Sequence, residues 1–152
     1  MTTSEESLED RRTAMQILAN TGSEKLEASY NAFPPKPEWT FVRAPETGLV
    51  MVRGKIGGGG APFNLGEMTV TRSTVTLETG EVGHAYVAGR DRRKAAIAAF
   101  FDAAYQNPDL KPIVRDRVLG PLGRALLAAD QKTAEQAAAT KVDFFTMVRG
   151  ED

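Results

Sequence analysis

Hydrophobic positions change their spacing twice along the chain. Up to about residue 33, and again from about residue 92 onward, apolar side chains recur at the spacing of an amphipathic helix. Between these regions the chain is rich in β-branched and aromatic residues, and glycines separate the segments. The pattern predicts an α+β protein in which a single antiparallel sheet is flanked by an N-terminal helical hairpin and by C-terminal helices.

The N-terminal hairpin is expected to contain two helices. Ser4 or Ser7 can cap the first, which ends at Asn20 to Gly22. Thr21 to Glu24 has the form of a capping box and opens the second helix. The prolines between Pro34 and Pro37 then end that helix and form a stiff connector.

The sheet is expected to have about four strands. Turn chemistry at Pro45 to Gly48 separates the first two, and Thr79-Gly80 suits a two-residue hairpin turn between the last two. The predicted strands are Trp39–Arg43, Leu49–Ile56, Phe63–Leu77 and Glu81–Ala88.

The last hairpin predicts which side chains share a face. A two-residue turn pairs Leu77 with Val82 and Val75 with His84, and the apolar residues then agree with the register. On this reading His84 is a hydrogen-bonded histidine of the core, on the same face as Tyr86.

The third predicted strand changes its apolar phase. Met68 and Val70 are even-numbered, whereas Val75 and Leu77 are odd-numbered. A side-chain period of two predicts an extra residue between them, a β-bulge between Thr71 and Thr74 that re-aims Arg72.

Helices are expected to follow the sheet. Asp91 caps a helix over Arg92–Gln106 that covers the apolar face of the sheet. A short helix then ends at Gly120, and Pro121 suits the first turn of the last helix. The apolar stripe of this helix thins from Asp130 to Lys141, which predicts a face turned to solvent or to a partner.

The C-terminal stretch Val142–Asp152 concentrates apolar side chains. We expect an apolar strand here, and two interpretations stay open: it folds back on the sheet of its own chain, or it docks into a partner. The residues assigned to this interface are Phe144, Phe145, Met147, Val148 and Arg149.

Composition narrows the class of protein. A chain of 152 residues, 41% hydrophobic and 26% charged, is typical of one globular domain, here residues 1–152. Its net charge of -1 argues against nucleic-acid binding driven by bulk electrostatics and leaves a local basic face open. With no cysteine and a single histidine, disulfides, iron–sulfur ligation, thiolate catalysis and a His-rich metal site are not expected. No apolar run has membrane length, and the acidic start Met1–Glu6 does not resemble a signal peptide, so we expect a cytoplasmic protein.

A glycine run is the main candidate for binding. Gly57, Gly58, Gly59 and Gly60 can turn several backbone N–H groups toward one anion, and Arg72 and Arg90 can add charge. Arg90 is the stronger arginine candidate because it precedes a predicted helix N-terminus. The Gly-Lys-Ser/Thr of a Walker loop is missing, and the alternative is a flexible hairpin loop. Arginines outside such a site would be solvated or paired with Glu46, Glu67 or Asp91.

No catalytic residue is assigned. His84 is the only imidazole, and Glu46 and Glu67 act as paired carboxylates only if the fold brings them within reach. No credible Ser-His-Asp set exists, so a free-standing hydrolase built on His84 and Glu46 is a minor hypothesis.

Four blocks resemble a known family. They are Arg43–Val50, Gly66–Arg72, Tyr86–Asp91 and, the most specific, Val142–Gly150. These residues closely resemble PhnG, the G subunit of the bacterial carbon–phosphorus lyase core complex. The resemblance covers roughly half of the chain, and the segments before Trp39 and from Lys111 to Lys141 match no motif.

The resemblance implies a non-autonomous subunit that assembles with the H, I and J subunits. The family helps to replace the adenine of ATP by a phosphonate, while the radical chemistry of bond cleavage belongs to subunit J. No cofactor is expected in this chain, and ATP is a substrate of the complex. No nucleic-acid or membrane partner is implied, and an isolated chain could bury Phe144 and Phe145 by homo-oligomerisation. The alternative is a stand-alone phosphate- or nucleotide-binding module that uses Gly57–Gly60 with Arg90.

Overall fold

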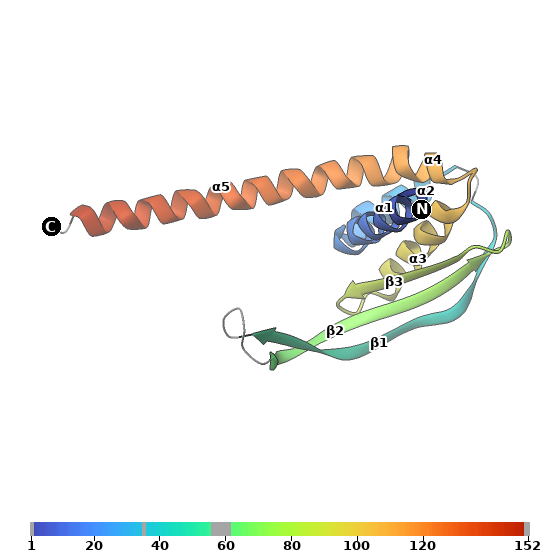
Figure 1. Cartoon of the computed structure of the whole chain (residues 1–152), viewed down its shortest axis with the longest axis horizontal. Coiled ribbons are helices and arrows are strands. Elements are labelled where there is room, and N and C mark those ends of the chain that lie inside the picture. The colour runs from blue at the N-terminus through green and yellow to red at the C-terminus, as the bar shows by residue number, and fades with distance from the viewer. Residues whose placement is uncertain (1, 35, 56–61, 151–152) are drawn as a thin grey trace.

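The computed structural model describes residues 2–34, 36–55 and 62–150. Three strands form one antiparallel sheet in the order β1-β2-β3, and the helices lie on one side of it (Figure 1). The strands are β1 (Trp39–Lys55), β2 (Pro62–Leu77) and β3 (Val82–Ala88). The helical elements are α1 (Thr2–Asn20), α2 (Ser23–Ala32), α3 (Arg92–Gln106), α4 (Lys111–Ile113), the π-helix η1 (Val114–Leu119) and α5 (Gly120–Gly150). The predicted α+β class is confirmed, with three strands in place of about four among the described residues.

The first two predicted strands are one continuous strand. β1 runs through Pro45–Gly48 without a turn, and its pairing with β2 shifts between Phe41 and Arg43 and again between Arg43 and Glu46. Each shift places an extra residue in β1. Because β1 is an edge strand, Pro45 can sit at such an irregularity without breaking an interior ladder.

The hairpin between β2 and β3 has a three-residue loop, not the predicted two-residue turn. Leu77 N–H donates to the Glu81 carbonyl at 2.9 Å, and Gly80 adopts a φ of 103°. A glycine with positive φ after a tight turn is typical of three-residue hairpin loops. The extra loop residue shifts the register by one, so that Val75 pairs with Gly83 and Thr74 with His84.

This shift reverses the predicted faces of β3. Gly83, Ala85 and Val87 are buried, and the burial pattern along β3 leaves His84 and Tyr86 exposed. The prediction of a core histidine is therefore wrong. A slip of one residue in register moves every side chain of a strand to the other face.

The predicted β-bulge between Thr71 and Thr74 is also wrong. β2 pairs with β3 without a break from Val70 to Thr76, and in the pairing with β1 the extra residue opposite Arg72–Thr74 lies in β1 and not in β2. The change of apolar phase has another cause, because the two sets of residues serve opposite faces. Val75 and Leu77 face the helices. Met68 and Val70 point to the opposite face of the sheet, where Met68 is 42% exposed and Val70 is buried.

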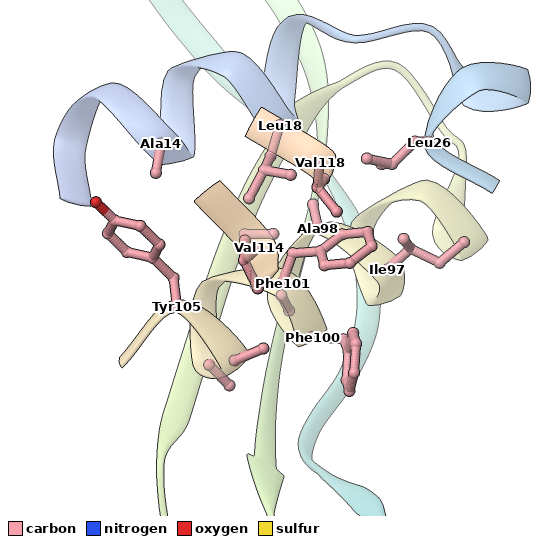
Figure 2. Close-up of a cluster of buried hydrophobic side chains, with 14 of the residues drawn as sticks. Ala14, Leu18, Leu26, Ile97, Ala98, Phe100, Phe101, Tyr105, Val114 and Val118 are labelled. Carbon is pink, nitrogen blue, oxygen red and sulfur yellow. The ribbon is translucent and has the colours of Figure 1, made fainter. Parts of the chain in front are cut away.

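The core lies between the sheet and the helices. Phe100 and Phe101 of α3 are fully buried, and Leu18, Leu26 and Val118 converge on them from α1, α2 and η1 (Figure 2). Burial of each large side chain contributes about 1.5–3 kcal/mol. Helix α3 has the predicted bounds, and its predicted cap is confirmed, because Asp91 Oδ1 accepts from Lys94 N–H at 2.9 Å.

The helical segments at the C-terminus follow one another without interruption. The predicted end at Gly120 is wrong, since α4, η1 and α5 run on from Lys111 to Gly150. The wider π-turn of η1 ends with Gly120 N–H donating to the Arg115 carbonyl, directly before Pro121. Proline lacks an N–H and crowds the preceding turn of an α-helix, and the wide turn gives it room. The expected C-terminal strand is likewise wrong, because its backbone is part of α5.

The N-terminal hairpin is confirmed in outline and corrected at its caps. Helix α1 begins at Thr2, before either predicted cap. Helix α2 has Gly22 as its N-cap residue, and the Thr21 hydroxyl instead donates to the Ile17 carbonyl at 2.6 Å. Thr21 thus closes the end of the first helix and does not open the second.

Candidate functional site

Arg72 lies on the sheet face that no helix covers. It sits between Glu46 on β1 and Tyr86 on β3, and its Nη2 is 3.2 Å from Glu46 Oε2. Hydrogen bonds with the Tyr86 side chain and with the Glu46 carboxylate raise the pKa of Arg72. A hollow of about 240 Å³ adjoins these three side chains. Arg72 is therefore already engaged by a carboxylate.

Arg90 lies in the turn between β3 and α3. It is exposed, next to the capping residue Asp91. Asp91 also accepts from the Ser23 hydroxyl at 2.6 Å, and the hydrogen bonds from Ser23 and from Lys94 N–H lower the pKa of Asp91. The N-terminus of α3 therefore already has a carboxylate at the position where an anion would bind.

The parts of the predicted anion site are spread along the sheet. Gly57, Gly58, Gly59 and Gly60 lie outside the described residues, and the strand ends that flank them are Lys55 and Pro62. The Gly89 N–H donates to the Thr69 carbonyl, so Arg90 follows directly after a residue bonded to Thr69. Thr69 lies seven residues along β2 from Pro62. At about 3.3 Å per residue this is roughly 20 Å, and Arg72 is more than about 30 Å from the same end. Within the described residues, neither Arg72 nor Arg90 lies close to Lys55 or Pro62, the strand ends that flank the glycine run.

The candidate acid–base groups are also separated. His84 Nδ1 contacts Thr74 Oγ1 at 3.2 Å on the exposed face. Glu46 is paired opposite Arg72, whereas Glu67 is paired opposite Met51, five residues further along β2 and on the other face. The two glutamates are therefore not paired carboxylates. Among the described residues no group of three or more His, Asp or Glu side chains is placed to hold a metal ion.

One buried ion pair was missed by the sequence analysis. Asp102 of α3 is 1% exposed, and Arg11 of α1 donates to both of its oxygens, from Nε at 3.0 Å and from Nη2 at 2.9 Å. The backbone N–H of His84 donates to Oδ2 at 2.8 Å. The hydrogen bond with Asp102 raises the pKa of Arg11. A lone aspartate beside Phe100 and Phe101 was the available signal, because a buried carboxylate requires partners.

Two parts of the molecule extend beyond the core. The first is the ribbon, defined here as Leu49–Lys55 of β1 with Pro62–Thr69 of β2, which β3 does not reach. Its large apolar side chains are exposed on both faces, and among the described residues they include Leu49 (64%), Met51 (55%), Leu65 (62%) and Met68 (42%). Isolated exposed apolar residues are ordinary, but a contiguous set marks an interaction surface.

The second is the outer part of α5. Leu127 is 64% exposed, and every side chain from there to Ala138 is exposed. Figure 1 shows α5 and the ribbon extending past the body toward the same end of the molecule. The backbone of the predicted interface residues Phe144, Phe145, Met147, Val148 and Arg149 belongs to this helix. In the described part of the chain, no helix has the length and apolarity needed to cross a membrane.

Comparison with known proteins gives one consistent result. The family model described as "Phosphonate metabolism protein PhnG" matches residues 9–150. A curated relative from Rhizobium meliloti (strain 1021) is 53% identical over 142 residues, which cover 93% of this chain and 90% of the relative. That relative is named alpha-D-ribose 1-methylphosphonate 5-triphosphate synthase subunit PhnG. The match extends well beyond the four blocks that suggested it, and the chain belongs to the PhnG family of phosphonate metabolism proteins.

Proposed function

We propose that this chain is an accessory subunit of a complex that transfers a phosphonate onto the ribose of ATP and releases adenine. The relative from Rhizobium meliloti, named as a subunit of a synthase that makes a ribose 1-methylphosphonate 5-triphosphate, supports this reaction. The chain contributes surfaces to the assembly and does not turn over substrate alone. Its partners are the H, I and J subunits.

The observation that carries the proposal is the exposure of apolar side chains on the ribbon. A two-stranded ribbon is marginally stable in water unless something covers it. Leu49 and Met51 lie on one face, while Met68 lies on the other. A partner that covers both faces removes this apolar area from water, which stabilises the complex by about 25 cal/mol for each Å² buried.

The second part of the proposed interface, after the ribbon, is the outer part of α5. Its outer part carries few large apolar residues until Phe144 and Phe145. We assign these two residues, with Met147, Val148 and Arg149, to contacts with a partner subunit. Because the ribbon and α5 extend toward the same end of the molecule, one partner can contact both.

The anion-binding residues are proposed to act only within the complex. Among the described residues, Arg72 and Arg90 are too few and too far from the strand ends Lys55 and Pro62 to form a polyphosphate site with the glycine run unaided. Each can instead complete a site whose remaining ligands come from a partner. Arg72 would then exchange Glu46 for a phosphate oxygen, since arginine suits bidentate contact with either group.

The test is co-expression with the H, I and J subunits followed by size-exclusion chromatography. We expect the native chain to co-elute stoichiometrically with its partners, and the Leu49→Lys/Met51→Lys variant to elute separately. A matched control, Ala28→Lys/Ala32→Lys, adds the same charge to exposed positions of α2 and should still assemble. Full phosphonate-ribosylating activity of the purified chain without partners would refute the proposal.

A further inference from the structure

A groove runs between α1 and the edge of the sheet formed by β3. It has a volume of about 690 Å³, within the roughly 300–1,000 Å³ of ligand-binding clefts. Its apolar lining comes from α1 and α3 and includes Leu8, Met15, Leu18 and Ala98. Leu8 is 66% exposed at the rim. Among the residues whose side chains the structure describes, none of those assigned above to the ribbon or to α5 lines this groove.

The groove follows the edge of β3 and not one of its faces. His84, Ala85 and Tyr86 all line it. Successive side chains of a strand point to opposite faces of the sheet. A cavity that touches three consecutive residues therefore lies along the strand edge, where backbone groups are accessible.

The hydrogen-bond pattern shows which backbone groups face the groove. Leu77 N–H donates to the Glu81 carbonyl, and Gly89 N–H donates to the Thr69 carbonyl, so the odd-numbered residues of β3 bond to β2. Because antiparallel ladders alternate, the N–H and C=O groups of the even-numbered residues point away from β2. The N–H of His84 confirms this direction by reaching Asp102.

Only the first half of this edge is covered by the chain itself. The side chain of Gln106 donates to the Val82 carbonyl at 2.6 Å, and Asp102 accepts from His84 N–H. From Tyr86 to Ala88 no such side-chain cap is present among the described residues. Uncovered backbone at a sheet edge is a template for another strand.

The charged side chains that line the groove are positive. Arg11 and Arg12 line it, and no carboxylate is among the described residues of its lining. Arg11 is held by Asp102, whereas Arg12 is exposed and has no ion pair among the described residues. The lining is therefore complementary to an acidic side chain.

We propose that this groove binds an extended segment of a partner subunit, which adds a fourth strand to the sheet beside β3. The segment bonds to the backbone of Tyr86 and Ala88, buries alternate apolar side chains against Leu8 and Met15, and places a carboxylate on Arg12. Main-chain bonds with side-chain pockets are the general mode of strand addition. The inference rests on the proposed function, because it assumes that the chain assembles with other subunits.

The first test is amide hydrogen exchange on the isolated chain and on its complex with the H, I and J subunits. We expect the amides of Tyr86 and Ala88 to exchange fast in the isolated chain and to be protected in the complex. Stable assembly with unchanged exchange at these amides would overturn the groove inference and leave the proposed function intact. Failure of the chain to assemble would overturn both. Protection in an isolated dimer would assign the edge to a second copy and overturn the inference.

The second test removes single features by substitution. Tyr86→Pro deletes the outward N–H without deleting a ladder bond to β2, and Tyr86→Ala is its matched control because it loses the same side chain and keeps the N–H. When both variants compete for limiting partners during co-expression, Tyr86→Pro should be incorporated about tenfold less, as expected for lost main-chain bonds. Equal incorporation would contradict strand addition.

A third variant does not alter the backbone. Arg12→Glu should reduce incorporation several-fold, while Arg117→Glu, an equal charge change at an exposed arginine outside the groove, should not. If both reversals reduce incorporation equally, the effect is one of net charge and the assignment of a carboxylate to Arg12 is wrong. Thermal unfolding of each isolated variant identifies any loss that comes from misfolding.

Discussion

The Arg11–Asp102 pair joins three elements through one buried carboxylate. Asp102 has hydrogen bonds on both oxygens, from α1 and from the backbone of β3, and its side chain is fully buried. Removing one partner of such a pair leaves a charge without compensation, which typically costs about 3–5 kcal/mol. We expect Arg11→Met to lower the free energy of unfolding by about 3 kcal/mol, measured by urea denaturation.

The double variant Arg11→Met/Asp102→Leu tests whether the charge is the cause. Replacement of both partners by apolar residues is often tolerated, so the double variant should recover part of the stability lost by Arg11→Met alone. Recovery should be incomplete because His84 N–H loses its acceptor. A double variant less stable than the single one would show that Asp102 is needed for the backbone of β3 and not for Arg11.

Asp91 predicts a dependence of stability on pH. Its pKa in the folded chain is below the usual value of 3.8, because Ser23 and Lys94 N–H donate to the carboxylate. A lowered folded-state pKa contributes stability that is present above the unfolded pKa and is lost as the pH falls through the folded value. Asp91→Ala should lower stability by about 1 kcal/mol at pH 7, as expected for loss of a helix cap.

Asp91→Asn separates the charge from the cap. Asparagine keeps an acceptor for Lys94 N–H but does not titrate in this range. The native chain should be more stable than Asp91→Asn at pH 7. The difference should shrink as the pH falls through the lowered folded-state pKa of Asp91, below 3.8, and should disappear once the carboxyl group is protonated in the folded chain as well. A difference that persists at lower pH, in thermal unfolding followed by circular dichroism, would mean that ionisation of Asp91 is not its source.

At the scale of elements, the distance between α3 and the sheet depends on Gly83. A Cβ placed there would lie 2.0 Å from the Ala99 carbonyl oxygen and 2.5 Å from Ala103 N, both backbone atoms of α3. Because backbone cannot move aside as a side chain can, Gly83→Ala should destabilise by about 3 kcal/mol, at the upper end for overpacking. Gly48→Ala is the control, since a Cβ there meets nothing within 4 Å and its φ is ordinary. Similar melting temperatures for the two variants would contradict this packing.

Elements with redundant signals could be predicted from the sequence. For α3, a capping aspartate and a strong periodicity agree, and its bounds match the structure. The predicted register of β3 depended only on the assumed length of the turn. The actual loop is one residue longer, which shifts the register and leaves His84 exposed. Pro45–Gly48 has the composition of a turn but lies inside β1, where pairing with β2 overrides the local preference.

The candidate site followed the same rule. Single residues such as Arg72 and Arg90 could be singled out by type, but their separation along the sheet depends on strand length and pairing. Asp102 lies within an apolar helix face, and neither its bond to Arg11 nor that to His84 follows from spacing. The family, in contrast, was identifiable from short blocks, because such matches require no geometry.

At the scale of the whole molecule, we expect the core and the two protruding parts, which are the ribbon and the outer part of α5, to have separate roles. The core side chains gather between the sheet and the helices, whereas the described side chains of α5 from Leu127 to Ala138 are all exposed. A helix without tertiary packing adds little to stability. The segment that follows such a stretch is therefore expected to serve assembly more than folding.

Deletion of Val142–Asp152 tests this division. The melting temperature of the isolated chain should change by less than about 2 °C, because a loss well below 1 kcal/mol shifts a domain of this size only slightly. Incorporation into the proposed complex with the H, I and J subunits should fall sharply, since Phe144 and Phe145 are lost. Deletion of residues 150–152 alone keeps both phenylalanines and should retain assembly. A chain without Val142–Asp152 that co-purifies stoichiometrically would exclude this segment from the interface and leave the ribbon as the main contact, because Leu49 and Met51 would still need to be covered.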